Sequence, residues 1–132
     1  QSVRLTSEIL VPMAAPGLVS DGDWRRLPRM AVVGPRQLWG DWFAAAGLAP
    51  EPAPTHKMDT FIVALEAARR GAGVLLGSRP LVDESLRDGS LVSLSDFALH
   101  GAAGHHLTAP AGGGLSHAEL ALRQWLVVEF TP

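Results

Sequence analysis

The five histidines are the first side chains to consider for chemistry, because imidazole is a common metal ligand and a common acid or base. They are His56, His100, His105, His106 and His117. The sequence contains no HxH, no HExxH and no two histidines four residues apart, and it has no cysteine that could supply a thiolate. Two of the histidines, His105 and His106, are adjacent in a strand-like run, so we expect their side chains to point to opposite faces. The pattern predicts no metal site.

Glycine-rich segments and serines come next, because they could hold a phosphate or form a nucleophile elbow. The segments are GAG at 71–73 and AGGG at 111–114. Neither has the GxxxxGKS/T or the GxGxxG spacing of nucleotide sites, and no GxSxG motif is present. We therefore expect no cofactor and no catalytic residue, and an enzyme is the least favoured class of function.

In two places, backbone groups rather than reactive side chains could bind a ligand. Each is an expected helix start after a strand-like run: Met58-Asp59-Thr60 and Gly77-Ser78-Arg79. A helix N-terminus has free N–H groups and a positive dipole, which suit a small anion. Ligands of open α/β sheets bind outside the carboxyl ends of strands, so we expect Thr60 and Ser78 to face one cleft. The alternative is that both residues only cap helices, which is their commoner use.

The composition indicates one globular domain without a nucleic-acid surface of its own. The chain has 132 residues, of which 47% are hydrophobic and 18% charged, and its formal net charge is −2. The eleven basic residues are scattered, which argues against binding to nucleic-acid phosphates by this chain alone. No apolar run approaches the roughly 20 residues that span a bilayer. We therefore expect no membrane partner and a cytoplasmic location.

Apolar runs and helical stripes alternate along the chain and predict the elements that position these residues. The expected strands cover 9–15, 30–33, 55–58, 73–77, 91–94 and 105–109. The expected helices open at Gly34-Pro35, after Asp59-Thr60, at Ser78 with a proline in its first turn, and at Ser116. Gly47, Gly71 and Gly89 are expected to end the first three helices, and GAAG at 101–104 to connect two strands. This alternation predicts an α/β fold with a mainly parallel sheet.

Apolar positions on these elements predict a core and one uncovered helix face. The expected core side chains are Trp39, Trp42, Phe43, Phe61, Leu65, Val74, Leu75 and Leu86. The last helix opens with a capping box of Ser116 and Glu119, and its apolar face includes Trp125. That face needs a partner, so we expect the chain to self-associate or to be part of a longer protein.

Several segments, taken in order, carry a resemblance to a known family. They are SEILVPMAAPGL, RQLWGDWFAAAGL, DTFIVALEAARRGAGVLLGSRPLVDESLRDGSLVSL, and GHHLTAP followed by a helix with QWL. Together they resemble the effector-binding domain of LysR-type transcriptional regulators over nearly the whole chain. The WxxWF pattern is similar to that of the subgroup of glycine-cleavage and β-lactamase activators.

This resemblance implies the type 2 periplasmic-binding-protein fold, in which two α/β subdomains are joined by two crossover strands and enclose a small effector. On that scheme, residues 1–12 are the crossover from subdomain I and residues 13–93 are the complete effector-binding subdomain II. Residues 94–132 are the return crossover and the C-terminal part of subdomain I. The DNA-binding domain and the first half of subdomain I would precede this sequence.

The resemblance also implies four ligand-facing positions. They are Ala15 at the end of the first crossover, Thr60 at a helix start, Ser78 after the glycine-bounded strand, and His105 in the returning strand. Asp59 is a weaker candidate, because a carboxylate would repel an anionic effector. At position 105 related regulators often have an aromatic residue, and the imidazole could keep that stacking role or add a charge.

The favoured function is a small-molecule effector-sensing and dimerisation module of a bacterial transcriptional regulator, with an effector that could be anionic. DNA would be bound only through the absent N-terminal domain, and self-association would use surfaces of subdomain I. The alternative is a solute-binding protein of the same fold, which would be exported. The residues before Gln1 would separate the two, by showing either a winged helix-turn-helix or a secretion signal.

Overall fold

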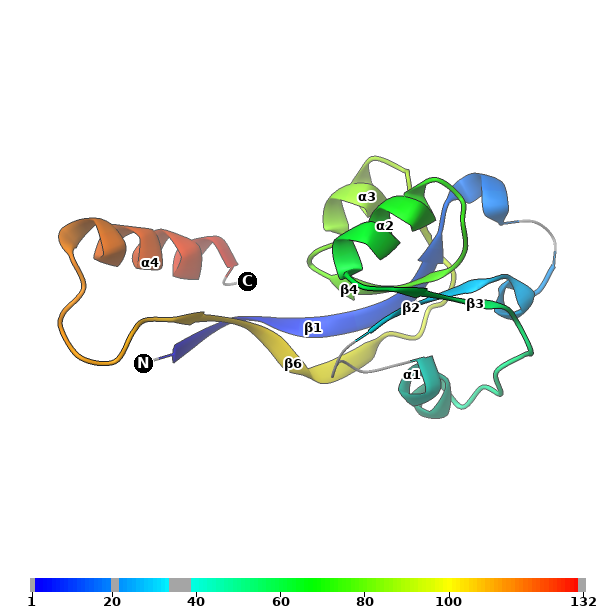
Figure 1. Ribbon diagram of the computed structural model, residues 1–132, viewed down its shortest axis with the longest axis horizontal. Helices are drawn as coiled ribbons and strands as arrows, with labels where there is room; N and C mark the ends of the chain where they lie inside the picture. Colours follow the sequence, from blue (N-terminus) through cyan, green and yellow to red (C-terminus); the bar gives the residue numbers. More distant parts are fainter. Residues whose placement is uncertain (1, 20–21, 34–38, 131–132) are drawn as a thin grey trace. The chain divides into compact units, whose positions relative to one another are not determined.

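The computed structural model describes residues 2–19, 22–33 and 39–130, and in it the chain forms two compact units (Figure 1). Unit 1 is made of residues 1–8 and 101–132, and unit 2 of residues 9–100. Two long strands, β1 (Ser2–Ala14) and β6 (Leu99–Thr108), pair with each other and contribute to both units. Unit 1 is therefore built from both ends of the chain, whereas unit 2 is continuous.

The larger sheet is organised around β1. This strand lies between β4 (Leu75–Arg79) and β5 (Val92–Ser93), and it is antiparallel to both. The expectation of a mainly parallel sheet is not confirmed here. It rested on the alternation of strands and helices along the chain, but β1 is a long strand that runs antiparallel to both β4 and β5.

Parallel pairing occurs in the smaller sheet of unit 2. There β2 (Arg29–Val32) and β3 (Thr55–Met58) are parallel and in register from end to end. Arg29 also forms a parallel bridge with Val74, the residue before β4. As a result β3, β2 and β4 run in the same direction, which fixes where their carboxyl ends lie.

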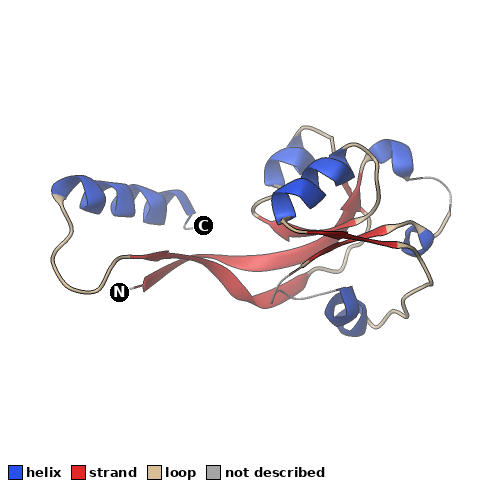
Figure 2. Cartoon of the chain, in the orientation of Figure 1, coloured by secondary structure: helices blue, strands red, loops and turns tan. Residues whose placement is uncertain are grey.

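Helices fill the connections of unit 2 and are drawn in blue in Figure 2. They are α1 (Trp39–Ala46), α2 (Phe61–Arg69), α3 (Asp83–Arg87) and short 3-10 helices at Pro16–Leu18 and Trp24–Arg26. The glycines predicted to end the longer helices, Gly47, Gly71 and Gly89, have φ values of +71°, +83° and +81°. This left-handed conformation suits glycine, and the prediction is confirmed. The predicted opening of the first helix at residues 34–38 lies outside the described residues.

Two apolar clusters form the core of unit 2, one on each face of β1. Val11 and Met13 pack in one cluster with Ala64 and Ala68 of α2. Leu10 packs in the other with the aromatic side chains of α1. Because successive strand residues point to opposite faces, α1 and α2 lie on opposite sides of β1, as Figure 1 shows.

The core predicted from the sequence is confirmed. All eight expected side chains are buried or half-buried in unit 2. Trp42 and Val74 are the most deeply buried, and both are 0% exposed.

The predicted connection at residues 101–104 is wrong, because these residues lie inside β6. A Cβ atom on Gly104 would collide with the carbonyl oxygen of Thr6 in β1. The glycine therefore permits a close approach between two strands and does not mark a turn.

Unit 1 also contains α4 (His117–Phe130). The predicted capping box is confirmed: the Ser116 N–H donates to Glu119 Oε2 at 2.6 Å, and the Glu119 N–H donates to Ser116 Oγ at 3.2 Å. No side chain of this helix is buried, and Trp125 is 58% exposed. The predicted apolar face is thus uncovered in the described part of the chain. None of the described helices has both the length and the apolar character needed to cross a bilayer.

Candidate functional site

Thr60 lies where the sequence places it, between β3 and the first turn of α2. Its backbone is extended, and its Oγ1 accepts a hydrogen bond of 3.3 Å from the N–H of Val63. The predicted cap is therefore confirmed. The cap uses the hydroxyl oxygen as an acceptor, so the hydroxyl hydrogen can still be donated to another molecule. Thr60 and the neighbouring Asp59 are both exposed.

Ser78 has a different environment from the predicted one. It lies in β4, where it is paired with Leu10 of β1 and only 1% exposed. The helix expected to open here begins at Asp83 instead, after a turn in which the Asp83 N–H donates to the carbonyl oxygen of Pro80. The proline that we interpreted as a first-turn residue belongs to that turn. Ser78 therefore does not lie at a helix N-terminus, and the predicted backbone anion site is absent at this residue.

Strand direction decides which of the predicted residues share an edge. Thr60 follows the carboxyl end of β3, and Ser78 is near the carboxyl end of β4. Both strands run in the direction of β2, so the two residues lie toward the same edge of unit 2. Ala15 follows the carboxyl end of the antiparallel β1, five positions along the strand from Leu10, the partner of Ser78. At about 3.3 Å per residue, Ala15 lies roughly 16 Å along the strand from Leu10, toward the edge opposite to that of Ser78.

Ala15 contributes backbone groups rather than a side chain to its surroundings. It is 9% exposed, and its carbonyl oxygen accepts a hydrogen bond of 3.0 Å from the N–H of Leu18. The predicted end of the strand over 9–15 is thus confirmed to within a residue, and a short 3-10 helix follows it.

His105 belongs to unit 1 and is half-buried in β6. Its Nδ1 lies 2.7 Å from Oγ1 of Thr6, and its backbone N–H donates to the same oxygen at 3.2 Å. The sequence analysis did not identify Thr6 as a partner. No local signal could have revealed it, because the two residues are 99 positions apart.

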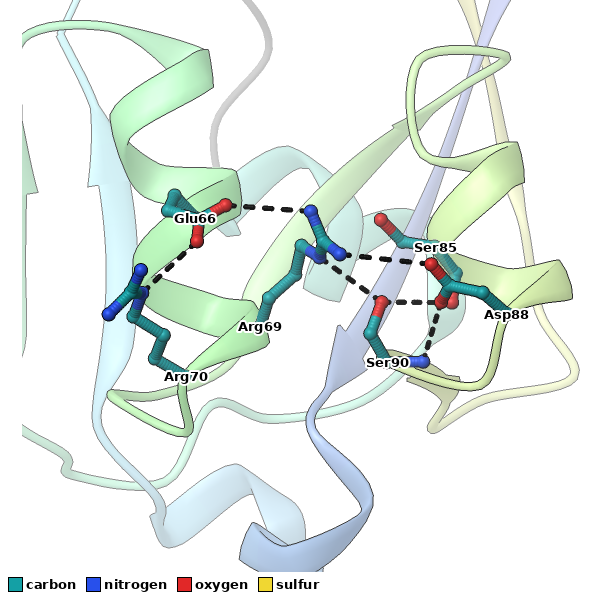
Figure 3. Close-up of polar contacts among 6 residues, drawn as sticks. All are labelled: Glu66, Arg69, Arg70, Ser85, Asp88 and Ser90. Atoms are coloured by element: carbon teal, nitrogen blue, oxygen red, sulfur yellow. Dashed lines mark hydrogen bonds and ion pairs between the residues drawn. The ribbon is translucent and has the colours of Figure 1, made fainter.

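The end of α2 that is remote from Thr60 is fixed by a polar cluster, which Figure 3 shows. Arg69 donates to Ser90 Oγ at 3.2 Å and forms ion pairs with Glu66 at 3.5 Å and Asp88 at 3.7 Å. Ser90 in turn donates to Asp88 Oδ1 at 2.8 Å and to the carbonyl oxygen of Ser85 at 3.3 Å. Hydrogen bonds from Ser90 lower the pKa of Asp88 below its ordinary value of 3.8. The cluster joins α2 to the segment after α3 and so helps to hold the helix that carries Thr60.

Aromatic packing holds β2, which lies between the strands of Thr60 and Ser78. The indole N–H of Trp39 donates to the carbonyl oxygen of Met30 at 2.8 Å. The guanidinium of Arg29 lies 5.3 Å from the centre of the Phe43 ring, within the range of a cation–π contact. These contacts tie α1 to β2.

Unit 1 contains a hollow of about 560 Å³, lined by the end of β6, residues 109–115 and the first turns of α4. Two charged side chains line it, those of Glu119 and Arg123, and the carboxylate of Glu119 is used by the capping box. None of the four predicted ligand residues lines this hollow. Within the described residues, no cluster of three or more histidine, aspartate and glutamate side chains could hold a metal ion.

Known proteins resemble this chain in both sequence and structure. Residues 1–130 match the family described as the LysR substrate binding domain. The chain is 32% identical to the uncharacterized HTH-type transcriptional regulator y4mQ of Sinorhizobium fredii, over 98% of this chain and 46% of that protein. It is 39% identical to the HTH-type transcriptional activator AmpR of Pseudomonas aeruginosa, over 67% of this chain and 30% of AmpR.

A solved structure of the effector domain of Pseudomonas aeruginosa AmpR superposes on this chain with a TM-score of 0.77 and 26% sequence identity. The superposition covers 97% of this chain and 64% of that domain. The chain thus spans less than half the length of the curated relatives it matches, and about two thirds of the solved domain.

Proposed function

This chain belongs to the LysR substrate-binding domain family, and we propose that it is the effector-sensing part of a transcriptional regulator. The observation that carries the proposal is the family match, which runs through residues of both units. In this proposal the chain binds a small molecule, and a separate domain of the same protein binds DNA. Such a regulator acts in the cytoplasm, where its DNA is, and it is not an enzyme.

We further propose that the units correspond to the two subdomains of a type 2 periplasmic-binding-protein fold. Residues 1–12 would be the first crossover, 13–93 subdomain II, and 94–132 the return crossover with part of subdomain I. Self-association would use surfaces of subdomain I. The uncovered apolar face of α4, with Leu122 and Trp125 more than half exposed, supports such a role.

For unit 2, we propose an effector contact at the edge that Thr60 and Ser78 share. Thr60 is the side chain best placed to touch the effector, because it is exposed and its hydroxyl hydrogen is not needed by the cap. The N–H groups in the first turn of α2 point out of the N-terminal end of the helix, as in any α-helix. They favour an oxygen acceptor or an anionic group there. Ser78 is buried, so it would support this edge from beneath. Ala15 stays a proposal from the resemblance alone, as does His105 of unit 1.

Substitutions of Thr60 in the full-length regulator test this proposal, with a promoter reporter and a DNA-binding assay as readouts. Thr60→Val removes both the hydroxyl and the cap, whereas Thr60→Asn keeps a good cap and removes the hydroxyl donor of threonine. Thr60→Ser keeps both and is the matched control. Inducers would be found by screening small carboxylates and other metabolites with the wild-type regulator.

We expect Thr60→Val and Thr60→Asn to shift the reporter dose response to inducer concentrations about tenfold higher or more, which corresponds to the loss of one hydrogen bond to a charged group. DNA binding should be unchanged in all variants, and Thr60→Ser should respond like the wild type. A Thr60→Val regulator with the wild-type dose response would show that the effector does not contact this residue.

A further inference from the structure

Thr6 and His105 make two contacts with each other, and both use the same hydroxyl oxygen of Thr6. The backbone N–H of His105 donates to this oxygen at 3.2 Å. The ring nitrogen Nδ1 of His105 lies 2.7 Å from it. Both residues belong to unit 1, and both are half-buried, so water competes only partly for these groups.

The hydrogen count of this pair favours one form of the imidazole. A threonine hydroxyl has one hydrogen to donate and two lone pairs to accept with. One lone pair accepts the His105 N–H, so the hydroxyl hydrogen can be donated to Nδ1. All these groups are then satisfied if Nδ1 carries no hydrogen. If Nδ1 carried the hydrogen, Thr6 would accept twice, and its own hydrogen would have no acceptor among the hydrogen bonds that the described residues form.

In the favoured form the ring hydrogen is on Nε2. This nitrogen has no hydrogen-bond partner within the described part of the chain. With Nδ1 bonded to Thr6 and Nε2 without a partner among the described residues, the ring can donate one hydrogen bond from Nε2 to another molecule.

Neighbouring contacts make the arrangement rigid. Arg4 donates to the carbonyl oxygens of Thr6 at 3.3 Å and Ala103 at 3.0 Å, and so links the two strands beside the pair. Gly104, which precedes His105, lies so close to the Thr6 backbone that a side chain there would collide with it. The distance between Thr6 and His105 is thus set by backbone contacts on the strand itself and not by the rotamers of the two side chains alone.

We propose that Thr6 is a positioning residue that selects the tautomer of His105 with its hydrogen on Nε2, so that position 105 donates a hydrogen bond to an oxygen acceptor of the bound small molecule. The second half of this statement rests on the proposed effector-sensing function; the first half concerns only the protein. The acceptor would be a carboxylate, carbonyl or phosphoryl oxygen. An ammonium group, which can only donate, would not be bound at this nitrogen.

Nitrogen-15 NMR of the histidine side chains in the 132-residue chain tests the ring state, in a mildly alkaline buffer in which imidazole is neutral. Protonated and unprotonated ring nitrogens have widely separated shifts. We expect the two shifts of His105 to lie at the extremes of the Nε2–H tautomer in the wild type and in Thr6→Ser. In Thr6→Val, which suits a strand but has no hydroxyl, they should move toward each other as the tautomers mix.

The wild-type spectrum alone can refute the proposal, even if Thr6→Val does not fold. A ring protonated on Nδ1, or a mixture of tautomers in the wild type, would overturn it. The same would follow if His105 had identical shifts in the wild type and in folded Thr6→Val, since the tautomer would then not depend on Thr6.

The donor role is tested with two simple probes, sodium acetate and methylammonium chloride, at equal ionic strength. We expect acetate to shift the Nε2 resonance of His105 saturably in the wild type, at least severalfold more weakly in Thr6→Val, and methylammonium to leave it unchanged. A shift by methylammonium and not by acetate would overturn the donor assignment. The ring state is measured without any effector. The two proposals can therefore fail separately. If His105 has a fixed tautomer but the Thr60 variants respond like the wild type, the proposed effector contact at Thr60 is wrong and the positioning role of Thr6 stands. If the Thr60 variants respond as expected but His105 is a mixture of tautomers, only the positioning role is wrong.

Discussion

The helices of unit 2 bury apolar side chains, whereas the helix of unit 1 leaves its own at least partly exposed. In unit 2, α1 and α2 bury tryptophan, phenylalanine and alanine side chains on the two faces of β1. In unit 1, α4 has an equally clear start signal and a longer helix, yet none of its side chains is buried. A 14-residue helix without tertiary packing is only marginally stable in water. The comparison shows that local signals can specify a helix without specifying what covers it.

Two tryptophans give the most direct test of this difference. Trp42 of α1 is 0% exposed, and Trp125 of α4 is 58% exposed. We expect Trp42→Ala to lower the free energy of unfolding by roughly 3–5 kcal/mol, because it leaves a cavity among the aromatic side chains. Trp125→Ala should change it by less than about 0.5 kcal/mol. Urea unfolding followed by far-UV circular dichroism measures both.

Trp42→Phe is the matched control, because it keeps an aromatic ring and removes the buried indole N–H. That N–H has no hydrogen-bond partner in the described part of the chain, so its removal should offset part of the lost packing. Equal losses of stability for Trp42→Ala and Trp125→Ala would show that α4 is packed as firmly as α1, and the contrast between the units would then be wrong.

Much of unit 2 could be predicted from its sequence because its signals are local. The apolar stripe of α1, the Thr60 cap of α2 and the glycine that ends each helix all act within a few residues. The capping box at Ser116 in unit 1 is of the same kind. In each case the physical cause lies in the segment itself, namely a side chain that satisfies a nearby backbone group or a backbone conformation that glycine tolerates.

Most of what the sequence did not reveal concerns contacts between distant segments. The direction of β1 relative to β4 decides that Ala15 and Ser78 lie toward opposite edges, and no local pattern encodes that direction. Gly104 was interpreted as part of a connection because its partner, the backbone of Thr6, is far away in sequence. For the same reason the contact of Thr6 with His105 could not be predicted. The start of the helix expected at Ser78 was predicted wrongly for a local reason. Proline is common both in the first turn of a helix and in a turn that precedes a helix, and Pro80 belongs to such a turn.

Gly104 allows the paired strands of unit 1 to be tested without changing any polar side chain. In Gly104→Ala the new methyl group would meet the carbonyl oxygen of Thr6, so β1 and β6 must separate locally. We expect a loss of about 1–3 kcal/mol, as for other overpacked sites, and faster amide hydrogen exchange in both strands. Gly112→Ala, in the loop before α4, is a control without such a neighbour, although its φ of +83° also favours glycine. Unchanged exchange at Thr6 and His105 in Gly104→Ala would mean that the close approach is absent in solution.

A smaller effect is expected from the cap of α4. Ser116→Ala removes the hydroxyl that accepts from the Glu119 N–H, and such losses cost roughly 0.5–2 kcal/mol of helix stability. Because α4 has no buried side chains, we expect the change to appear as faster amide hydrogen exchange confined to this helix, with the exchange of α2 unaffected. Ser116→Asp, another good cap, should exchange like the wild type. Faster exchange that spreads to both units would contradict the view that α4 is stabilised mainly by its own ends.

The smallest expected effect is on pH dependence, and it again compares one carboxyl from each unit. Hydrogen bonds from Ser90 lower the pKa of Asp88 below 3.8, and hydrogen bonds from Ser116 lower the pKa of Glu119 below 4.5. A carboxyl whose pKa is lower in the folded state than in the unfolded state stabilises the fold above its ordinary pKa, and this contribution is lost as the pH falls through the lowered value.

Asp88 belongs to the cluster that joins α2 to the segment after α3, so Asp88→Asn should reduce the acid-dependent loss of stability of unit 2 as a whole. Glu119→Gln should flatten only the pH dependence of exchange in α4, because that helix is not packed into a core. Urea midpoints and amide exchange measured from neutral pH down through the ordinary carboxyl pKa separate the two. If Glu119→Gln altered the urea midpoint as much as Asp88→Asn does, α4 would have to unfold together with unit 2, and the two units would be one cooperative structure.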